Sequence, residues 1–282
     1  MEMDVQKKTL TTSDNCAIAY TLRPAQGKPG APRLALVHSL ALDGSIWDDV
    51  AAKLSGRAEI LTYDCRGHGQ SDRNVDSFTM ELFAGDLAEL LDHLGWPSAV
   101  VAGCSMGGCV AQAFAAENPS RVRALGLIDT TAWYGKDAPK NWKERAAAAR
   151  SKGLASLVEF QATRWFSDRF RKAHPEVVKR MTEIFLANDL ESYSATCLML
   201  GEMDLRPKLP MLTMPVVVIV GEEDYATPVA MAQQLHEAIR GSTLTVIPGG
   251  RHLTPVECPD QIAEKLLTLL ERADYQKTIS GA

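Results

Sequence analysis

A serine within a short glycine-rich segment is the residue of this sequence best suited to covalent chemistry. The segment reads Gly103-Cys104-Ser105-Met106-Gly107, a G-x-S-x-G pattern. It follows an apolar run at residues 99–103 that is typical of a buried strand, and a helix-like run comes after it. A serine on such a sharp strand-to-helix turn stands clear of the sheet at a helix N-terminus, where negative charge is stabilised. The pattern predicts a nucleophile at Ser105; the alternative is a glycine turn with a structural role only.

A serine hydroxyl is a weak nucleophile, so it needs a base that a third group holds in place. In proteins with this strand–turn–helix motif, an acid and then a histidine follow the serine along the chain. His252 comes after a late apolar run and the pair Gly249-Gly250, which lets a loop curl back over the serine. His174 and His236 lie in helix-like segments, where we expect them to contact solvent. The predicted base is His252.

Three carboxylates follow the apolar run at residues 216–220, and one of them is the expected third member. Asp224 stands at the apex of the loop, before a Thr-Pro pair typical of a helix start, and we expect Glu222 and Glu223 to be exposed. The acid of such a site is buried against the histidine ring, where it fixes the tautomer and stabilises the imidazolium. The predicted acid is therefore Asp224.

Acyl transfer also needs hydrogen-bond donors for the oxyanion. One is expected from the backbone N–H of Met106, directly after the nucleophile, and the other from Leu40, in the loop after an early strand. Because the backbone donates, neither side chain needs to be polar. His38, in the same loop, is expected to have a structural role.

Cysteines and the segment at residues 64–71 offer other chemistry. The six cysteines show neither a C-x-x-C pair nor zinc-ligand spacing, so we expect them to be reduced and inert, and we expect no metal and no cofactor. Cys104 adjoins Ser105, but the motif assigns the nucleophile to the serine. In residues 64–71, Arg66 and His68 either bind an anion or hold a loop together, and we favour the second interpretation.

The elements that position these residues follow an alternating strand and helix pattern. Apolar runs without strict alternation indicate strands buried on both faces, at residues 33–38, 60–63, 99–103, 124–128, 216–220 and 244–247. Residues 80–94 have leucines at helical spacing and stop at Gly95, and a second such helix starts near Pro259. The chain to about residue 22 is expected to form an antiparallel hairpin. The pattern predicts an α/β fold with a mostly parallel central sheet and flanking helices.

The alternation stops at residues 133–209, which are rich in Ala, Lys, Arg, Glu and aromatic residues. Two ordinary crossover helices are the alternative, but the stretch is too long for one connection. We therefore predict a core at residues 1–132 and 210–282, interrupted by a helical cap at residues 133–209.

The composition is that of a globular protein and excludes some partners. The chain has 282 residues, of which 46% are hydrophobic and 23% charged. A formal charge of -5 and a pI near 5.7 argue against nucleic acid as a partner. We see neither a stretch long enough to span a membrane nor a secretory signal, so we expect no membrane association and a cytoplasmic location. The sequence predicts no oligomeric state.

Several of these motifs together resemble the α/β-hydrolase fold: residues 38–40, 64–71, 103–108, 221–228 and 250–252. Within the predicted cap, residues 164–166, 173–177 and 203–206 resemble the 3-oxoadipate enol-lactonases of bacterial aromatic degradation. The similarity runs from about residue 33 to residue 272. Arg251, directly before the predicted base, stands where a small residue is commoner in that family.

The resemblance implies Ser105, Asp224 and His252 as a catalytic triad, with Leu40 and Met106 as the oxyanion hole. It also implies hydrolysis, without a cofactor, of a small lactone that carries carboxylate. The alternatives are a broader carboxylesterase, a carbon–carbon bond hydrolase of ring-cleavage products, and, from another class, a ligand receptor without turnover.

An anionic substrate under the cap requires cationic or strongly donating groups there. An arginine fits this role because its planar guanidinium matches a carboxylate with two hydrogen bonds. The candidates are Arg145 and Arg164, with Trp142 and Trp165 as an apolar wall. The alternative is that the arginines face water and the tryptophans pack in the core. If both arginines are structural, the anion is held elsewhere, and Arg251 is the next candidate.

Overall fold

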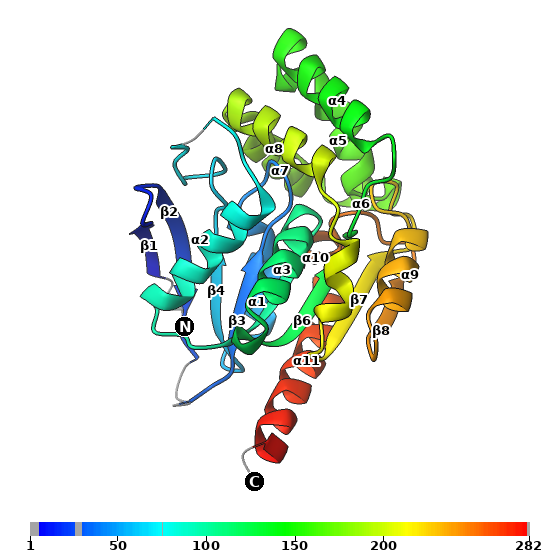
Figure 1. Cartoon of the computed structure of the whole chain (residues 1–282). Coiled ribbons are helices and arrows are strands. Elements are labelled where there is room, and N and C mark those ends of the chain that lie inside the picture. Colours follow the sequence, from blue (N-terminus) through cyan, green and yellow to red (C-terminus); the bar gives the residue numbers. More distant parts are fainter. Residues whose placement is uncertain (1–5, 26–29, 75, 281–282) are drawn as a thin grey trace.

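A single eight-stranded sheet forms the centre of the computed structural model, which describes residues 6–25, 30–74 and 76–280 (Figure 1). The strand order is β1-β2-β4-β3-β5-β6-β7-β8, and all neighbours from β4 to β8 are parallel. The two leading strands pair antiparallel with each other, and β2 pairs antiparallel with β4. The strands are β1 (Gln6–Thr11), β2 (Ala17–Arg23), β3 (Arg33–Val37), β4 (Glu59–Tyr63), β5 (Ala99–Cys104), β6 (Val122–Ile128), β7 (Val216–Gly221) and β8 (Thr243–Ile247).

Helices cover both faces of the sheet, which is why β5 and β7 are buried along their whole length. One face is covered by α2 (Met80–His93), α3 (Met106–Glu117) and α9 (Val229–Ala238), and the other by α1 (Asp48–Lys53), α10 (Thr254–Glu257) and α11 (Pro259–Ser280). Three short 3-10 helices, η1 (Gly44–Trp47), η2 (Pro119–Arg121) and η4 (Arg206–Met211), complete the core. This architecture confirms the predicted α/β class with a mostly parallel sheet and flanking helices.

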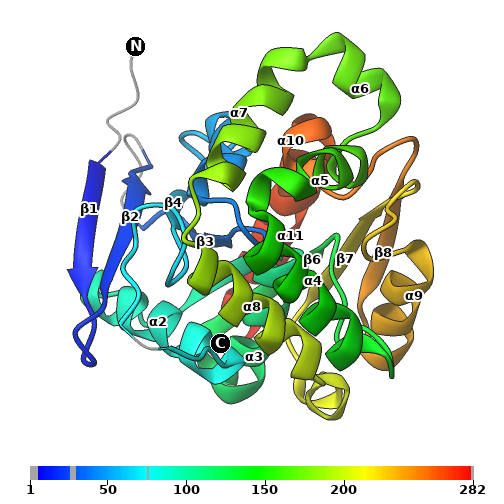
Figure 2. The same ribbon diagram turned by 90° about the horizontal axis from the view of Figure 1, so that it is seen from above.

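A group of helices between β6 and β7 lies over the carboxyl edge of the sheet (Figures 1 and 2). They are α4 (Ala138–Lys152), η3 (Leu154–Leu157), α5 (Val158–Trp165), α6 (Asp168–Ala173), α7 (Pro175–Leu186) and α8 (Leu190–Glu202). The two ends of the group meet: Trp133 bridges Asp204, and the N–H of Leu205 donates to the carbonyl of Ala132 at 2.8 Å. The helices therefore leave the sheet and return to it at neighbouring points. The division into a core and a cap domain remains a prediction.

The loop at residues 64–71 is held by buried ion pairs. The Arg66 guanidinium, 1% exposed, pairs with Asp86 at 2.5 Å and with Asp14 at 2.7 Å. His68 is buried beside His38, whose Nε2 accepts a hydrogen bond from the N–H of Cys65 at 2.7 Å. Because two carboxylates occupy the guanidinium, Arg66 has a structural role, as favoured from the sequence.

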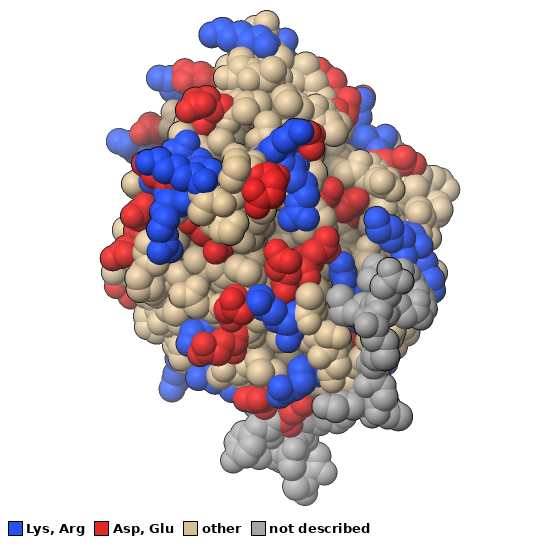
Figure 3. All heavy atoms as spheres, turned by 180° about the vertical axis from the view of Figure 1, so that it is seen from behind, with Lys and Arg blue, Asp and Glu red and all other residues tan. Residues whose placement is uncertain are grey.

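The remaining surface and cysteine features bear on partners. The cysteines of the described chain are unpaired, and Cys258 alone among them is partly exposed. No helix in the described ranges is long and apolar enough to cross a bilayer, and no group of three metal-ligating side chains is found there. Figure 3 shows acidic and basic side chains interspersed over the rear face of the molecule.

Candidate active site

Ser105 lies on a strained turn between β5 and α3. Its backbone angles are φ 54° and ψ -119°, in a region that residues other than glycine rarely adopt. The turn is closely packed: a Cβ on Gly103 would lie 2.0 Å from the carbonyl oxygen of Gly107, and one on Gly107 would lie 2.2 Å from that of Val37. The glycines of the motif therefore allow the turn to form, and the turn presents Ser105 at the start of a helix.

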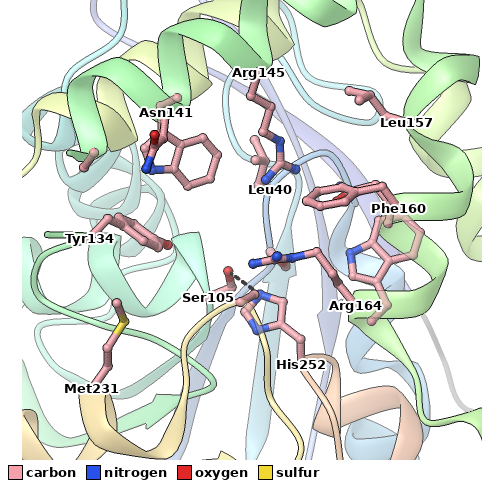
Figure 4. A pocket seen from close by; sticks show the side chains of 16 residues that line it. Leu40, Ser105, Tyr134, Asn141, Arg145, Leu157, Phe160, Arg164, Met231 and His252 are labelled. Atoms are coloured by element: carbon pink, nitrogen blue, oxygen red, sulfur yellow. Dashed lines mark hydrogen bonds between the residues drawn. The ribbon is translucent and has the colours of Figure 1, made fainter.

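A chain of hydrogen bonds leads from Ser105 to a buried carboxylate. Ser105 Oγ lies 2.9 Å from His252 Nε2, and His252 Nδ1 lies 2.8 Å from Asp224 Oδ2 (Figure 4 shows the first bond). Asp224 also accepts hydrogen bonds from the N–H groups of Ala226 (2.7 Å) and Thr227 (2.9 Å) and from the Thr227 hydroxyl (2.9 Å). All three side chains are at least nine-tenths buried. The structure thus brings together the three residues proposed from the sequence.

The other two carboxylates of the Asp224 loop point elsewhere. Glu222 accepts a hydrogen bond from the N–H of Gly249 at 2.9 Å, and Glu223 pairs with Arg251 at 3.3 Å. Neither contacts the ring of His252. The geometry therefore favours Asp224 over its two neighbours as the partner of the histidine.

A further buried carboxylate, Asp129 at the end of β6, holds the loops that carry these residues. It accepts hydrogen bonds from the N–H of Gly221 (3.0 Å) and from the N–H and hydroxyl of Thr254 (2.9 and 2.6 Å). Burial raises the pKa of Asp129 well above its usual range, and the charge of Asp224 raises it further. Sequence reasoning missed this residue, although an aspartate directly after a buried strand is a signal that could have found it.

The two backbone N–H groups predicted for the oxyanion belong to adjoining segments. Met106 is the first residue of α3, so its N–H has no partner within the helix. Leu40 follows β3 and lines the same cavity as Ser105. Since the backbone of Gly107 packs against the last carbonyl of β3, the start of α3 and the Leu40 loop are held together.

A cavity of about 450 Å³ lies between Ser105 and His252 on one side and α4 and α5 on the other (Figure 4). All four residues proposed for substrate binding line it: Trp142, Arg145, Arg164 and Trp165. The structure therefore places them at the site rather than in solvent. Figure 4 shows both guanidinium groups directed into the cavity, with that of Arg164 beside Ser105 and His252.

The contacts that hold the two arginines in place do not neutralise their charge. Arg145 Nε donates to the Tyr193 hydroxyl at 2.7 Å, and its guanidinium lies 4.8 Å from the centre of the Trp142 ring. Arg164 donates to the carbonyl of Tyr225 at 2.9 Å. In the described chain neither forms an ion pair, and the described lining has no acidic side chain. Burial lowers the pKa of Arg164, and repulsion by Arg145 lowers it further. The cavity is therefore positively charged.

Sequence reasoning missed several lining residues that a helical pattern could have revealed. In and beside α4 the lining positions are 138, 141, 142 and 145, and in and beside α5 they are 157, 160, 161, 164 and 165. These spacings of three and four place the residues of each helix on one face. Tyr134, before α4, and Met231, in α9, come from other elements and show no such signal.

Arg251, the alternative anion site, does not line the cavity. Its guanidinium donates to the carbonyls of Thr163 (2.8 Å) and Phe166 (2.9 Å), at the end of α5, and pairs with Asp168 at 3.1 Å and with Glu223 at 3.3 Å. Carbonyls and carboxylates therefore occupy it. Arg251 joins α5 to the loops of His252 and Asp224, and it does not bind an anion in the cavity.

Known proteins share this architecture. Residues 32–259 match the alpha/beta hydrolase fold family. The chain is 34% identical to 3-oxoadipate enol-lactonase 2 of Acinetobacter baylyi over 266 residues. The matched region covers 94% of this chain and 97% of that protein. Two solved structures are each 30% identical to this chain. One is an enol-lactonase from Burkholderia xenovorans LB400, with a TM-score of 0.89 over 94% of this chain and 100% of that one. The other is a thermophilic esterase from Thermogutta terrifontis with malate bound, with a TM-score of 0.85 over 95% of this chain and 99% of that one. By fold and by sequence, this protein belongs to the α/β-hydrolase family and is similar to its enol-lactonases.

Proposed function

We propose that this protein is a serine hydrolase that opens a small lactone bearing a carboxylate, with 3-oxoadipate enol-lactone as the substrate. The observation that carries the proposal is the hydrogen-bonded set of Ser105, His252 and Asp224 beneath a cavity with two unneutralised arginines. The first feature supports acyl transfer, and the second supports an anionic substrate.

In the proposed mechanism, His252 takes the proton of Ser105 as Oγ attacks the ester carbonyl carbon. Asp224 keeps the imidazole in the required tautomer, and the N–H groups of Leu40 and Met106 stabilise the oxyanion. The C–O bond of the ring then breaks, and the departing oxygen receives the proton from His252. Water, activated by the same histidine, hydrolyses the acyl-enzyme. In a lactone the departing oxygen stays tethered to the acyl part, so nothing needs to leave between the two steps.

The charge of the cavity supports an anionic substrate. Two half-buried cations without an acidic partner in an ion pair repel each other, and an anion between them relieves that repulsion. A guanidinium in a cavity interacts with a carboxylate more strongly than it does in open solvent, because there is less water to screen the charges. The similarity to 3-oxoadipate enol-lactonase 2 supports the choice of lactone, and the malate in a 30% identical esterase fits an anionic ligand.

A broader carboxylesterase is the second candidate, because one relative of known structure is an esterase at the same identity as the enol-lactonase. A carbon–carbon bond hydrolase has no specific observation in its favour. A receptor without turnover does not require the hydrogen bonds that join Ser105, His252 and Asp224.

The decisive experiment compares turnover of 3-oxoadipate enol-lactone with turnover of a simple aryl acetate by the purified protein. We expect kcat/KM for the lactone to exceed that for the acetate by at least about a hundredfold, which is about 2.7 kcal/mol of transition-state stabilisation. Ser105→Ala should abolish both activities and prevent labelling by a fluorophosphonate, which should modify the wild type once per chain. Equal kcat/KM values would favour the carboxylesterase. Activity retained by a folded Ser105→Ala variant would refute the mechanism.

A further inference from the structure

The hydroxyl of Tyr134 faces the nucleophile from within the cavity. Tyr134 lines the cavity, and Figure 4 shows its hydroxyl directed toward Ser105. The polar side chains that act on this hydroxyl include the Ser105 hydroxyl and the Cys109 thiol. Its ring packs edge-on against Trp142, with 5.1 Å between ring centres, and this contact restricts the direction of the hydroxyl. A third hydrogen-bonding group therefore lies beside Ser105 and His252.

The segments that carry Tyr134 and Leu40 follow the two strands that flank β5, one on each side. The nucleophile follows β5, which lies between β3 and β6 in the sheet. Leu40 follows β3, and Tyr134 follows β6. In the tetrahedral adduct the oxyanion points toward Leu40 and Met106, so other substituents of the carbon face the β6 side. One of these is the oxygen that departs.

The phenol is protonated under ordinary conditions. Burial raises the pKa of Tyr134 well above its usual value. Burial also raises the pKa of Cys109 to about 11, so the neighbouring thiol is neutral as well. Both groups are therefore neutral near pH 7, and the phenol has a proton to donate.

We propose that Tyr134 donates a hydrogen bond to the departing oxygen of the ester or lactone, and this inference rests on the proposed function. The bond between Ser105 Oγ and the carbonyl carbon forms first and gives the tetrahedral adduct. When the adduct collapses, the carbonyl re-forms, the bond from that carbon to the departing oxygen breaks, and its electron pair goes to that oxygen. The oxygen receives its proton from His252. Tyr134 keeps its own proton and stabilises the negative charge that develops before the transfer is complete.

The consequence is a change in sensitivity to the leaving group. A weakly acidic alcohol accumulates more charge as it departs than an acidic phenol does, so the hydrogen bond contributes more to its reaction. Loss of the Tyr134 hydroxyl should therefore slow the hydrolysis of esters of weakly acidic alcohols and leave the hydrolysis of esters of acidic phenols nearly unchanged. A hydroxyl that only holds Ser105 in place would affect all of these esters equally.

The test uses Tyr134→Phe and three monoesters of succinate that share one anionic acyl part: 4-nitrophenyl, phenyl and ethyl. We expect kcat/KM for the 4-nitrophenyl ester to stay within about twofold of wild type and that for the ethyl ester to fall by about tenfold, since one hydrogen bond contributes about 1.4 kcal/mol. Tyr20→Phe is the matched control, because Tyr20 is a buried residue of β2 whose hydroxyl contacts His93 of α2, away from the cavity. It should leave all three rates unchanged.

Two results would overturn the inference: an equal loss on all three esters, or no loss on any. Circular dichroism and the thermal midpoint identify a folding defect, and Tyr134→Leu provides a second variant without the hydroxyl that should give the same selective loss. Failure of the proposed function has a different signature, because Ser105→Ala would then still turn over the 4-nitrophenyl ester. If Ser105→Ala is inactive and Tyr134→Phe shows no selectivity, only the role of Tyr134 is wrong.

Discussion

Replacing Arg164 tests whether the cavity recognises the charge of its substrate. Arg164→Met keeps an unbranched apolar side chain that can pack against Phe160, whose ring centre lies 4.8 Å from the guanidinium carbon. Of the two cavity arginines, Arg164 has the guanidinium that lies nearer to Ser105 and His252 (Figure 4). The change removes this positive charge. It also removes the hydrogen bond to the carbonyl of Tyr225, the residue directly after Asp224.

The expected loss in kcat/KM follows from the N–H donors that the Arg164 guanidinium can offer to a substrate. One N–H group is already used by Tyr225, so a substrate carboxylate can take a charged hydrogen bond from the remaining donors. Such a bond contributes about 1.5–3 kcal/mol, which corresponds to about a 10- to 150-fold change in kcat/KM. Arg145 retains its charge in the variant, so we expect the lower part of this range. The double variant with Arg145→Met should lose more than either single change.

The assay measures kcat/KM for the anionic lactone and for neutral phenyl acetate in parallel. Arg164→Met should lower the first by about tenfold or more and the second by less than about twofold. Arg150→Met is the matched control: this arginine is on α4, is exposed and pairs with Glu191 at 2.6 Å, so its loss changes the net charge equally without reaching the cavity. Equal losses on both substrates, or no loss on either, would show that Arg164 is structural.

Three further predictions concern the acid, the turn and the response to pH. Asp224→Asn should lower kcat by about three to four orders of magnitude through the wrong tautomer of His252, whereas Glu223→Gln should have little effect, and the reverse order would refute the assignment. Gly107→Ala should lower the free energy of unfolding by about 3 kcal/mol because its Cβ meets the β3 backbone, and Gly85→Ala, with open space around it in α2, should raise it by about 0.5–1 kcal/mol; chemical denaturation tests both. Burial and the neighbouring His38 lower the pKa of His68 from 6.5 to about 3. Below pH 6.5 the unfolded chain therefore binds a proton at this residue that the folded chain does not. The free energy of unfolding should therefore fall by about 1.4 kcal/mol per pH unit between pH 6.5 and 3 from this group, and urea titrations of His68→Gln that keep the wild-type slope would contradict this.

Local sequence signals were sufficient for the fold. Buried parallel strands need continuous apolar runs, and these marked the strands from β3 to β8 to within two residues, because few other structures accommodate such runs. Their ends were less accurate: β6 begins at Val122 and not at residue 124, since a ladder continues wherever a neighbouring strand offers partners. The helical segment at residues 133–209 was identified by its composition, but its folding over Ser105 was not encoded in any short stretch.

For the candidate site, too, some features were determined by the sequence and others only by the tertiary structure. The sequence by itself determined the turn that presents Ser105, because the motif states which residues a tight strand-to-helix turn tolerates, and the chain order after it led to His252 and to a loop with three carboxylates. Among these three the sequence also favoured Asp224, because it precedes a Thr-Pro pair, and in the structure Asp224 contacts His252 while Glu222 and Glu223 have other partners. Only the tertiary structure decided that Arg145 and Arg164 face one cavity while Arg251 binds the end of α5. Short motifs encode local backbone geometry, whereas the direction of a long side chain depends on elements distant in sequence that pack around it.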